Sequence, residues 1–423
     1  MSNFGGFVRR QGKIIRLFGD GSRSEDARPD EGAIDPFTGV PYVRYETLYR
    51  TSHSSVTETL NTLATKAVVT FPEDEFLLHD FAALDKGGAV THSALNLEKS
   101  TVCGIVGYRR TRFRLVEGSS TRGGTPVAPA QSSGGTTQAR IIRSVDATGP
   151  LTIRNIEVLG TPQPYSKDGT NYRSHNYHAL EIFRPMGPVQ VTNVQLRGWH
   201  GDHGAPPGET SGLAVTMGSP QPLTIQDIDA DGRFADSSDI AGTVGVHVLR
   251  AISPRMKHIR THHQRAAASA VNYHTFDAQW EDCIFGEGSI DSPELNKKAW
   301  AFNGECNDGV ILKDCTFSKA NDGFHISHSN GSHEIMPGQP YTSINGSLTV
   351  INPTFTTPSL GNLLAIHTWQ RGIDGQDTVG ASTIPTPPTR MRVVDSMGRG
   401  QRFYFVQNTH HTIQSDDLPQ GGL

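Results

Sequence analysis

Val189-Gln-Val-Thr-Asn193-Val194 is an alternating apolar strand that ends at an asparagine and resumes with another apolar residue. The same pattern returns along most of the chain, about every 24 to 43 residues. The corner residues of its copies are Asn155, Asn193, Asp227, His258, Asp282, Asp314, Asn352 and Asp395. Asn and Asp suit such a corner because they tolerate left-handed backbone and hydrogen-bond the local chain. The repeat therefore predicts stacked coils, each of which buries its core against its neighbours.

A second series of strands runs in step with the first. Each strand begins with a small residue and alternates afterwards, as in Gly212-Leu-Ala-Val215. The apolar residues expected to point inward are Leu180, Leu213, Val246, Val271, Trp300, Phe324 and Leu364. Period-2 alternation marks strands with one buried face, and no helical pattern separates the strands of a repeat. We expect an all-β chain that folds as a right-handed, single-stranded parallel β-helix.

The composition excludes several classes of protein. Among 423 residues, 38 basic and 42 acidic side chains leave a net charge of −4, without the basic excess of a nucleic-acid-binding protein. No run approaches the roughly 18 apolar residues of a membrane span. The four cysteines fit neither a disulfide framework nor a CxxC metal motif. We expect a soluble protein that binds no nucleic acid and inserts into no membrane.

The chain divides into three predicted parts. Residues 1–54 form an N-terminal lead-in or attachment segment, residues 55–400 the parallel β-helix, and residues 401–423 a C-terminal coil or tail. Ser55-Val-Thr-Glu58 is a capping box, and the apolar residues after it fall on one face. This predicts a short helix that caps the open N-terminal end of the solenoid.

Three N-terminal motifs resemble those of a known group. Leu17-Phe-Gly-Asp-Gly21, Val69-Thr-Phe-Pro-Glu-Asp-Glu-Phe76 and Val102-Cys-Gly-Ile-Val-Gly107 resemble the opening turn, the next strand and the first coil of the pectate-lyase-like β-helix superfamily. The chain is most similar to tailspikes and β-helical minor tail proteins of tailed bacteriophages. The acidic helix that usually follows the first motif is absent, and no polygalacturonase or epimerase catalytic signature is matched. The resemblance implies a virion protein that forms homotrimers, and it implies no particular activity.

The N-terminal sequence favours the same function. Its first residues lack the apolar segment of a secretory signal, as expected of a protein made in the host cytoplasm and assembled into a virion tail. We expect a tailspike-like or minor tail protein that contacts other tail proteins and a host cell-surface polysaccharide, with degradation of that polysaccharide left open. The alternatives are a polysaccharide lyase or glycoside hydrolase of the β-helix class, and a purely structural tail protein. No cofactor is expected.

The second series of strands predicts a polar stripe on the solvent side. Residues that follow the inward apolar positions should point outward and mix imidazole, amide, hydroxyl and aromatic groups, which suits sugar hydroxyls and sugar faces. The predicted glycan-binding residues are His247, Asn272, His274, Asn303, His325, Ser327, His367 and Trp369. The alternative is a decorated sheet face without a ligand.

Three carboxylates near this stripe are candidate catalytic residues: Glu181, Asp202 and Asp322. Glycoside hydrolysis needs two carboxylates about 5–10 Å apart, and adjacent coils, about 4.8 Å apart, would supply such a pair. A lyase or epimerase would instead use a base such as histidine. Asp202 and Asp322 also fit a role as turn residues.

Two segments only partly match a metal site. Asp227-Ile-Asp-Ala-Asp231-Gly232 imitates the start of a calcium loop, but Ser238 stands where the loop needs glutamate. His258, His262 and His263 are histidines in one strand without a matching ligand set in the sequence around them. The sequence therefore predicts no metal site.

Overall fold

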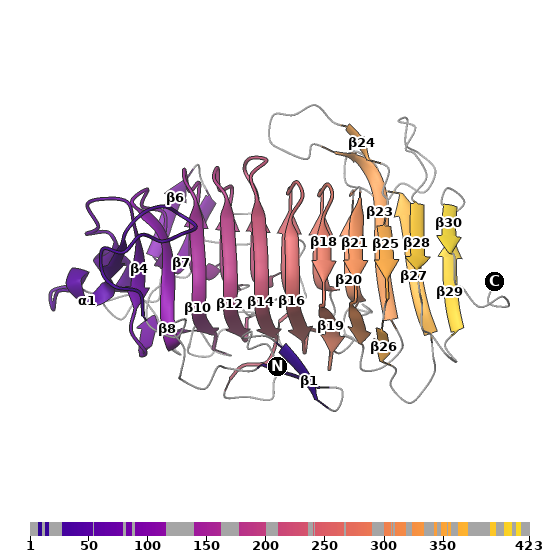
Figure 1. The fold of residues 1–423 in the computed structure, drawn as a ribbon, viewed down its shortest axis with the longest axis horizontal. Coiled ribbons are helices and arrows are strands. Elements are labelled where there is room, and N and C mark those ends of the chain that lie inside the picture. Colours follow the sequence, from indigo (N-terminus) through magenta and orange to yellow (C-terminus); the bar gives the residue numbers. More distant parts are fainter. Residues whose placement is uncertain are drawn as a thin grey trace, which may run out of the picture.

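Parallel pairing of the repeats builds two long sheets that run side by side along the molecule (Figure 1). In this computed structural model the strands along the main path of each sheet pair in parallel with the strands one coil before and one coil after, apart from the antiparallel pair β6–β7, which confirms the right-handed parallel β-helix. The structure describes residues 28–115, 139–161, 177–199, 210–289 and 300–318, with short gaps. It also describes two strands before residue 17 and the strands named below that follow residue 318.

The 16-stranded sheet forms one wall of the helix. Its main path, in spatial order, is β3 (Tyr42–Arg44), β4 (Ala67–Phe71), β8 (Val102–Leu115), β10 (Leu151–Leu159), β12 (Val189–Arg197), β14 (Leu223–Asp231), β16 (Arg255–His262), β18 (Gln279–Glu281), β21 (Val310–Lys313), β25 (Leu348–Ile351), β28 (Arg390–Val394) and β30 (Thr412–Ser415). Beside that path lie β5 (Glu75–Leu78), β19 (Ile284–Glu287), β22 (Thr316–Ser318) and β26 (Thr354–Thr356).

The 12-stranded sheet forms a second wall. Its path is β29 (Arg402–Gln407), β27 (Leu363–Gln370), β23 (Phe324–His333), β20 (Trp300–Glu305), β17 (Ala268–Tyr273), β15 (Val244–Leu249), β13 (Ser211–Thr216), β11 (Tyr177–Phe183), β9 (Ala139–Val145), β7 (Ala89–Asn96) and β6 (Ala82–Lys86), with β24 (Thr342–Ile344) beside β23. The hairpin of β1 (Phe7–Arg10) and β2 (Lys13–Arg16) pairs separately. The predicted boundaries at residues 54 and 400 stay a prediction. β3 lies before the first boundary, and β29 and β30 lie after the second, and all three belong to the two sheets.

The corner residues have the left-handed backbone that the repeat predicts. Values of φ between 48° and 57° occur at Asn155, Asn193, Asp227, His258, Asp282, Asp314 and Asn352. Their side chains connect successive coils: Asn193 Nδ2 donates to Asn155 Oδ1 over 2.7 Å, and Asn352 Nδ2 donates to Asp314 Oδ1 over 3.1 Å. Asp395 lies outside the described residues. Each of these bonds fixes the register of two neighbouring coils.

Inside the coils, apolar residues stack on their register partners. One stack, with every member at most 1% exposed, is Ile153, Val191, Ile225, Met256, Trp280, Leu312 and Val350. Burying an apolar side chain of this size contributes about 1.5–3 kcal/mol. The core is therefore a continuous column whose ends need covering.

The predicted short helix covers the N-terminal end. It is α2 (Val56–Leu60), and the Oγ of Ser55 accepts a hydrogen bond from the Glu58 backbone N–H over 3.1 Å, as a helix cap does. The other helix of the described residues, α1 (Tyr45–Leu48), precedes it. Neither is long and apolar enough to cross a membrane.

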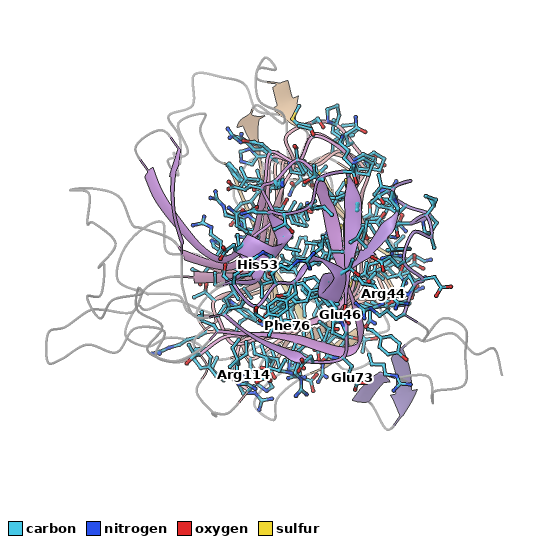
Figure 2. All side chains as sticks on the ribbon, turned by 90° about the vertical axis from the view of Figure 1, so that its left-hand side faces the viewer. Arg44, Glu46, His53, Glu73, Phe76 and Arg114 are labelled. Atoms are coloured by element: carbon cyan, nitrogen blue, oxygen red, sulfur yellow. The ribbon has the colours of Figure 1, made fainter. Side chains whose placement is uncertain are left out.

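Aromatic rings fill the first coil behind these helices. The ring of Phe71 lies 4.8 Å from that of Tyr45 and 5.1 Å from those of Phe76 and Phe113. Figure 2 views the molecule from this end, with Phe76 near the middle of the coil. The rings close the core column where it would otherwise meet water.

The corner conformation can be tested at Asn193. Asn193→Ala keeps the left-handed strain and removes the bond to Asn155, so it should lower the free energy of unfolding by about 1–2 kcal/mol. Asn193→Gly also loses the bond but relieves the strain, and should cost less. Denaturant unfolding would measure both variants, with the half-buried neighbour variant Thr192→Ala as the control. Equal losses in the alanine and glycine variants would contradict the role assigned to the backbone.

Candidate functional site

One row of the 12-stranded sheet gathers polar residues from successive coils. Its register partners are Arg143, Glu181, Ala214, His247, Val271, Asn303, Ser327 and His367. We call this set the outer row. Strands of a sheet lie about 4.8 Å apart, so the row repeats at that distance along the helix axis.

A local break in alternation turns the outer row away from the core. Before three of the described row positions two consecutive residues belong to the core: Ile141 and Ile142, Ala179 and Leu180, and Ala301 and Phe302. Two inward residues in succession shift the pattern by one, so the residue on each side of the pair faces outward. Arg140 and Arg143 flank such a pair in β9, and both side chains bond to Glu181.

Glu181 is held in a buried ion-pair triad. Arg140 Nε donates to Glu181 Oε2 over 2.6 Å and Arg140 Nη2 donates to Oε1 over 2.9 Å, while Arg143 Nε donates to Oε2 over 2.9 Å. Burial alone would raise the pKa of Glu181, but the charge and hydrogen bonds of Arg140 outweigh it and lower that pKa to about 2. The carboxylate is therefore ionised at neutral pH, and this arrangement does not favour Glu181 as the general acid of a glycoside hydrolase.

Two neutral histidines lie beside this triad. Burial, together with the charge of Arg140, lowers the pKa of His178 to about 3, and its Nδ1 accepts a hydrogen bond from the Ser211 backbone N–H over 3.0 Å. Burial lowers the pKa of His247 to about 4. Both imidazoles are therefore uncharged at neutral pH and can accept a proton or a hydrogen bond.

A tyrosine links His247 to the next coils. The ring of Tyr273 meets that of His247 edge-on, with centroids 5.3 Å apart. Asn303 Nδ2 donates to the Tyr273 hydroxyl over 2.6 Å. Val271 packs with Val244 and Tyr273 in a cluster separate from the main core. These contacts fix the side chains of the outer row from β15 to β20.

Three polar atoms of this region have no hydrogen-bond partner within the part of the chain that the structure describes. They are Ser211 Oγ, His247 Nε2 and Asn303 Oδ1, all buried. Leaving a buried polar atom unpaired costs about 1–3 kcal/mol, so such atoms usually meet water or a ligand. Their occurrence on three of four successive strands of one sheet, β13, β15 and β20, marks this region as the candidate site.

A second row, two residues further along each strand, is more exposed. Its described members are Phe183, Thr216, Leu249 and Tyr273, which are register partners and half-buried. Glu305, Ser329 and Trp369 continue the same register. We call this set the rim row. It offers two aromatic rings beside the polar outer row.

The structure brings together part of the predicted site. Glu181, His247 and Asn303 lie in the outer row, where Ser327 and His367 also fall in register. Trp369 falls in the rim row, and His325 pairs with Ala365 two positions before the outer row. Side chains in β23 and β27 are outside the described part, as are Asp202 and Asp322 altogether. His274 follows β17 at a corner with φ of 52°.

The outward orientation predicted for Asn272 is wrong. Asn272 is fully buried, its Oδ1 accepts a hydrogen bond from Trp280 Nε1 over 3.4 Å, and its Nδ2 donates to Thr275 Oγ1. The register aligns Ala270 with Val246, so Val271 takes the outward position beside His247. Strict alternation from the small residue onward missed the paired inward residues.

Four contributors to the site were missed in the sequence: Arg140, Arg143, His178 and Tyr273. A signal was present in β9, where two arginines three residues apart flank two isoleucines. Their partner Glu181 lies one coil away, and only the register reveals it.

No protein-family model and no curated protein sequence matches the chain. Solved structures with a similar fold include the enzymatically active domain of tailspike protein 2 from bacteriophage CBA120, at 9% identity and a TM-score of 0.45 over 96% of this chain. The chain spans 46% of that protein, about half its length.

Two carbohydrate-active enzymes are also similar. The A-module of a mannuronan C-5 epimerase from Azotobacter vinelandii has 12% identity and a TM-score of 0.38, over 88% of this chain and 91% of its own. A GH87 α-1,3-glucanase catalytic unit from Streptomyces thermodiastaticus has 11% identity and a TM-score of 0.36, over 91% and 69%. At such values, function has to be argued from this chain's own residues.

The triad predicts a strong effect of Glu181→Gln. The change leaves two buried guanidinium groups without their carboxylate, which should cost about 3–5 kcal/mol of unfolding free energy. Because the folded pKa of about 2 lies below the ordinary 4.5, the wild type should lose this stabilisation as pH falls from 4.5 towards 2. The glutamine variant should lack this loss.

Denaturant unfolding across that pH range tests the prediction. The control is Glu73→Gln, which removes an exposed ion pair with Arg109 and should cost less than about 1 kcal/mol. If both variants lost the same free energy of unfolding, the buried triad would stabilise the protein no more than an exposed ion pair does.

Proposed function

We propose that the outer row and the rim row bind an extended polysaccharide of the host cell surface. The observation that carries the proposal is the rim row, with the half-buried rings of Phe183 and Tyr273, running beside buried polar atoms that lack partners in the described part of the chain. A polymer of repeating units suits a surface that repeats about every 4.8 Å. The proposal also includes the remaining predicted glycan-binding residues, which are His274, His325, Ser327, His367 and Trp369.

The rim row would stack against sugar rings, and the outer row would form hydrogen bonds with sugar hydroxyl groups. The ring of Tyr273 offers a flat apolar face for a sugar ring, and so does the face of Phe183 that the Arg184 guanidinium does not cover. His247 and Asn303 offer nitrogen and oxygen atoms that bond hydroxyl groups in either direction. The fixed side-chain contacts of Tyr273 hold these groups in place before a ligand arrives, which reduces the entropy lost on binding.

We further propose that the chain is a bacteriophage tail component, a tailspike-like or minor tail protein located in the virion. The three N-terminal motifs at residues 17–21, 69–76 and 102–107 support this, together with the parallel β-helix. The proposal includes a homotrimer of coils packed side by side and contacts with other tail proteins. Residues 1–54 would provide the attachment.

The neutral histidines favour a polysaccharide lyase as a second candidate. A lyase needs a base for a proton next to a uronate carboxylate, and an uncharged imidazole with an unpartnered Nε2, as in His247, suits that task. Asp202 and Asp322 remain the proposed carboxylates for the alternative, a glycoside hydrolase. Unsaturated uronate absorbance would appear with a lyase, new reducing ends with either enzyme, and neither product with a binding protein.

Replacing one rim-row ring should weaken glycan binding. Tyr273→Ala removes a stacking face and should lower affinity about 10-fold, whereas Tyr273→Phe keeps the ring and should lose less. The measurement is binding of the full chain to immobilised bacterial capsular and cell-wall polysaccharides. Tyr49→Ala, which removes an exposed tyrosine near the N-terminal cap, is the control. Wild-type binding that persists in Tyr273→Ala with native circular dichroism would place the site elsewhere.

A further inference from the structure

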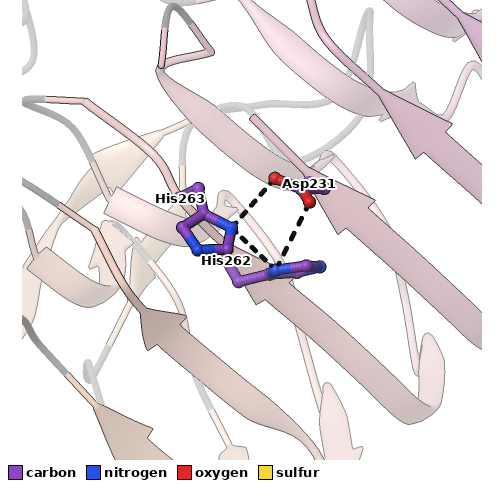
Figure 3. A group of neighbouring side chains, drawn as sticks. All are labelled: Asp231, His262 and His263. Carbon is purple, nitrogen blue, oxygen red and sulfur yellow. Dashed lines mark hydrogen bonds and ion pairs between the residues drawn. The ribbon is translucent and has the colours of Figure 1, made fainter. Parts of the chain in front are cut away.

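A second cluster lies on the 16-stranded sheet, away from the outer row. Asp231 ends β14, His262 ends β16 one coil later, and His263 follows directly (Figure 3). His262 Nδ1 lies 3.0 Å from His263 Nδ1 and 3.7 Å from Asp231 Oδ2, while His263 Nδ1 lies 3.0 Å from Asp231 Oδ1. The parallel register joins residues about 32 positions apart in the sequence, so spacing along the chain did not reveal the set.

We propose that Asp231, His262 and His263 bind one divalent transition-metal ion, for which zinc is the best fit. Donors placed about 2.0–2.1 Å from a tetrahedral zinc ion are about 3.3–3.4 Å apart. The two separations of 3.0 Å lie near that value, and one ligand atom from each of the three residues lies within 4.8 Å of the other two. Two imidazoles and a carboxylate favour zinc, cobalt or copper over calcium and magnesium.

The second nitrogen of His262 is oriented as in a metal ligand. His262 Nε2 lies 2.7 Å from Asp229 Oδ1, and that carboxylate can only accept, so Nε2 carries the proton. The neutral ring then presents a lone pair on Nδ1 towards His263 and Asp231. Histidines that bind metals usually donate their other N–H to a carboxylate in this way, which fixes the ring and strengthens the ligand.

The position of His263 in its coil is unusual. His263 belongs to a series of residues, one from each successive coil, that directly follow register partners of the 16-stranded sheet. The series is Gly160, Gly198, Gly232, His263 and Gly288, and the backbone N–H of each of the first four donates to the coil that follows. Gly198 and Gly288 have φ of 66°, and His263 has φ of 54°. Glycine adopts this conformation freely and histidine does not. His263 is the one member of this series with a side chain, and that side chain reaches His262 and Asp231.

The surrounding charges are compatible with a partly open site. Arg233 Nη2 donates to Asp231 Oδ2 over 3.0 Å, and Arg197 Nη1 donates to the same oxygen over 3.3 Å. Oδ1 accepts two further bonds, from the Arg233 backbone N–H over 3.0 Å and from Arg233 Nε over 3.3 Å. A metal on Oδ1 would replace the contact with His263, share this oxygen with Arg233, and leave the two bonds to Oδ2 in place. The Asp231 and His262 side chains are 3% and 5% exposed, and His263 is 20% exposed, so solvent reaches the site beside His263. Water from that side would complete the coordination.

Zinc titration of the full chain tests this site. Isothermal titration calorimetry would use protein without a histidine tag, freed of metal with a chelator, and zinc chloride alone as the probe. We expect one equivalent to bind and to raise the melting temperature. His263→Gly, which places in this coil the residue found in its neighbours, should weaken binding at least 10-fold, and Asp229→Asn should weaken it about 10–100-fold.

The matched control is His258→Asn. It removes a histidine from the same strand, outside the triangle, and installs a residue that other corners carry, so zinc binding should be unchanged. Cobalt in place of zinc should give the visible absorption of a tetrahedral site in the wild type and not in His263→Gly. The proposal fails if the wild type binds no zinc, or if natively folded His263→Gly binds it as well as the wild type.

Discussion

Register between neighbouring coils is the constraint on which the rest of this molecule depends. Backbone hydrogen bonds of parallel strands permit many alignments, and a slip of one residue would exchange the core and solvent faces. The left-handed corners, with side-chain bonds such as Asn193 to Asn155, select one alignment in each described coil. Once this register is set, the inward apolar residues of successive coils lie on top of one another and form the core column.

The same register creates both polar surfaces. On the 12-stranded sheet it places Arg140 and Arg143 of one coil around Glu181 of the next. On the 16-stranded sheet it places Asp231 beside His262 and His263. Neither group exists within a single repeat. In a solenoid, residues about one coil apart in sequence become neighbours in space, so the stacking of coils can form polar clusters that no single repeat contains.

The sequence predicted the fold well because the corner residues and the alternating strands repeat independently and agree. It predicted the outer row less well. Asn272 was misplaced because some strands of this sheet have two inward residues in succession, and an apolar pair such as Ala270-Val271 does not show which member is inward. Asp231 was not associated with His263 because the number of residues in a coil varies, and ligand spacing across coils is then irregular.

The central claim is that the outer row and the rim row form the ligand site. The most direct measurement is a crystal structure of the full chain with an oligosaccharide of the host surface polysaccharide. The account predicts density for sugar units along β11 to β20, with one ring against Tyr273 and polar contacts to His247 or Asn303. Density confined to another face, with these residues unchanged and uncontacted, would contradict it.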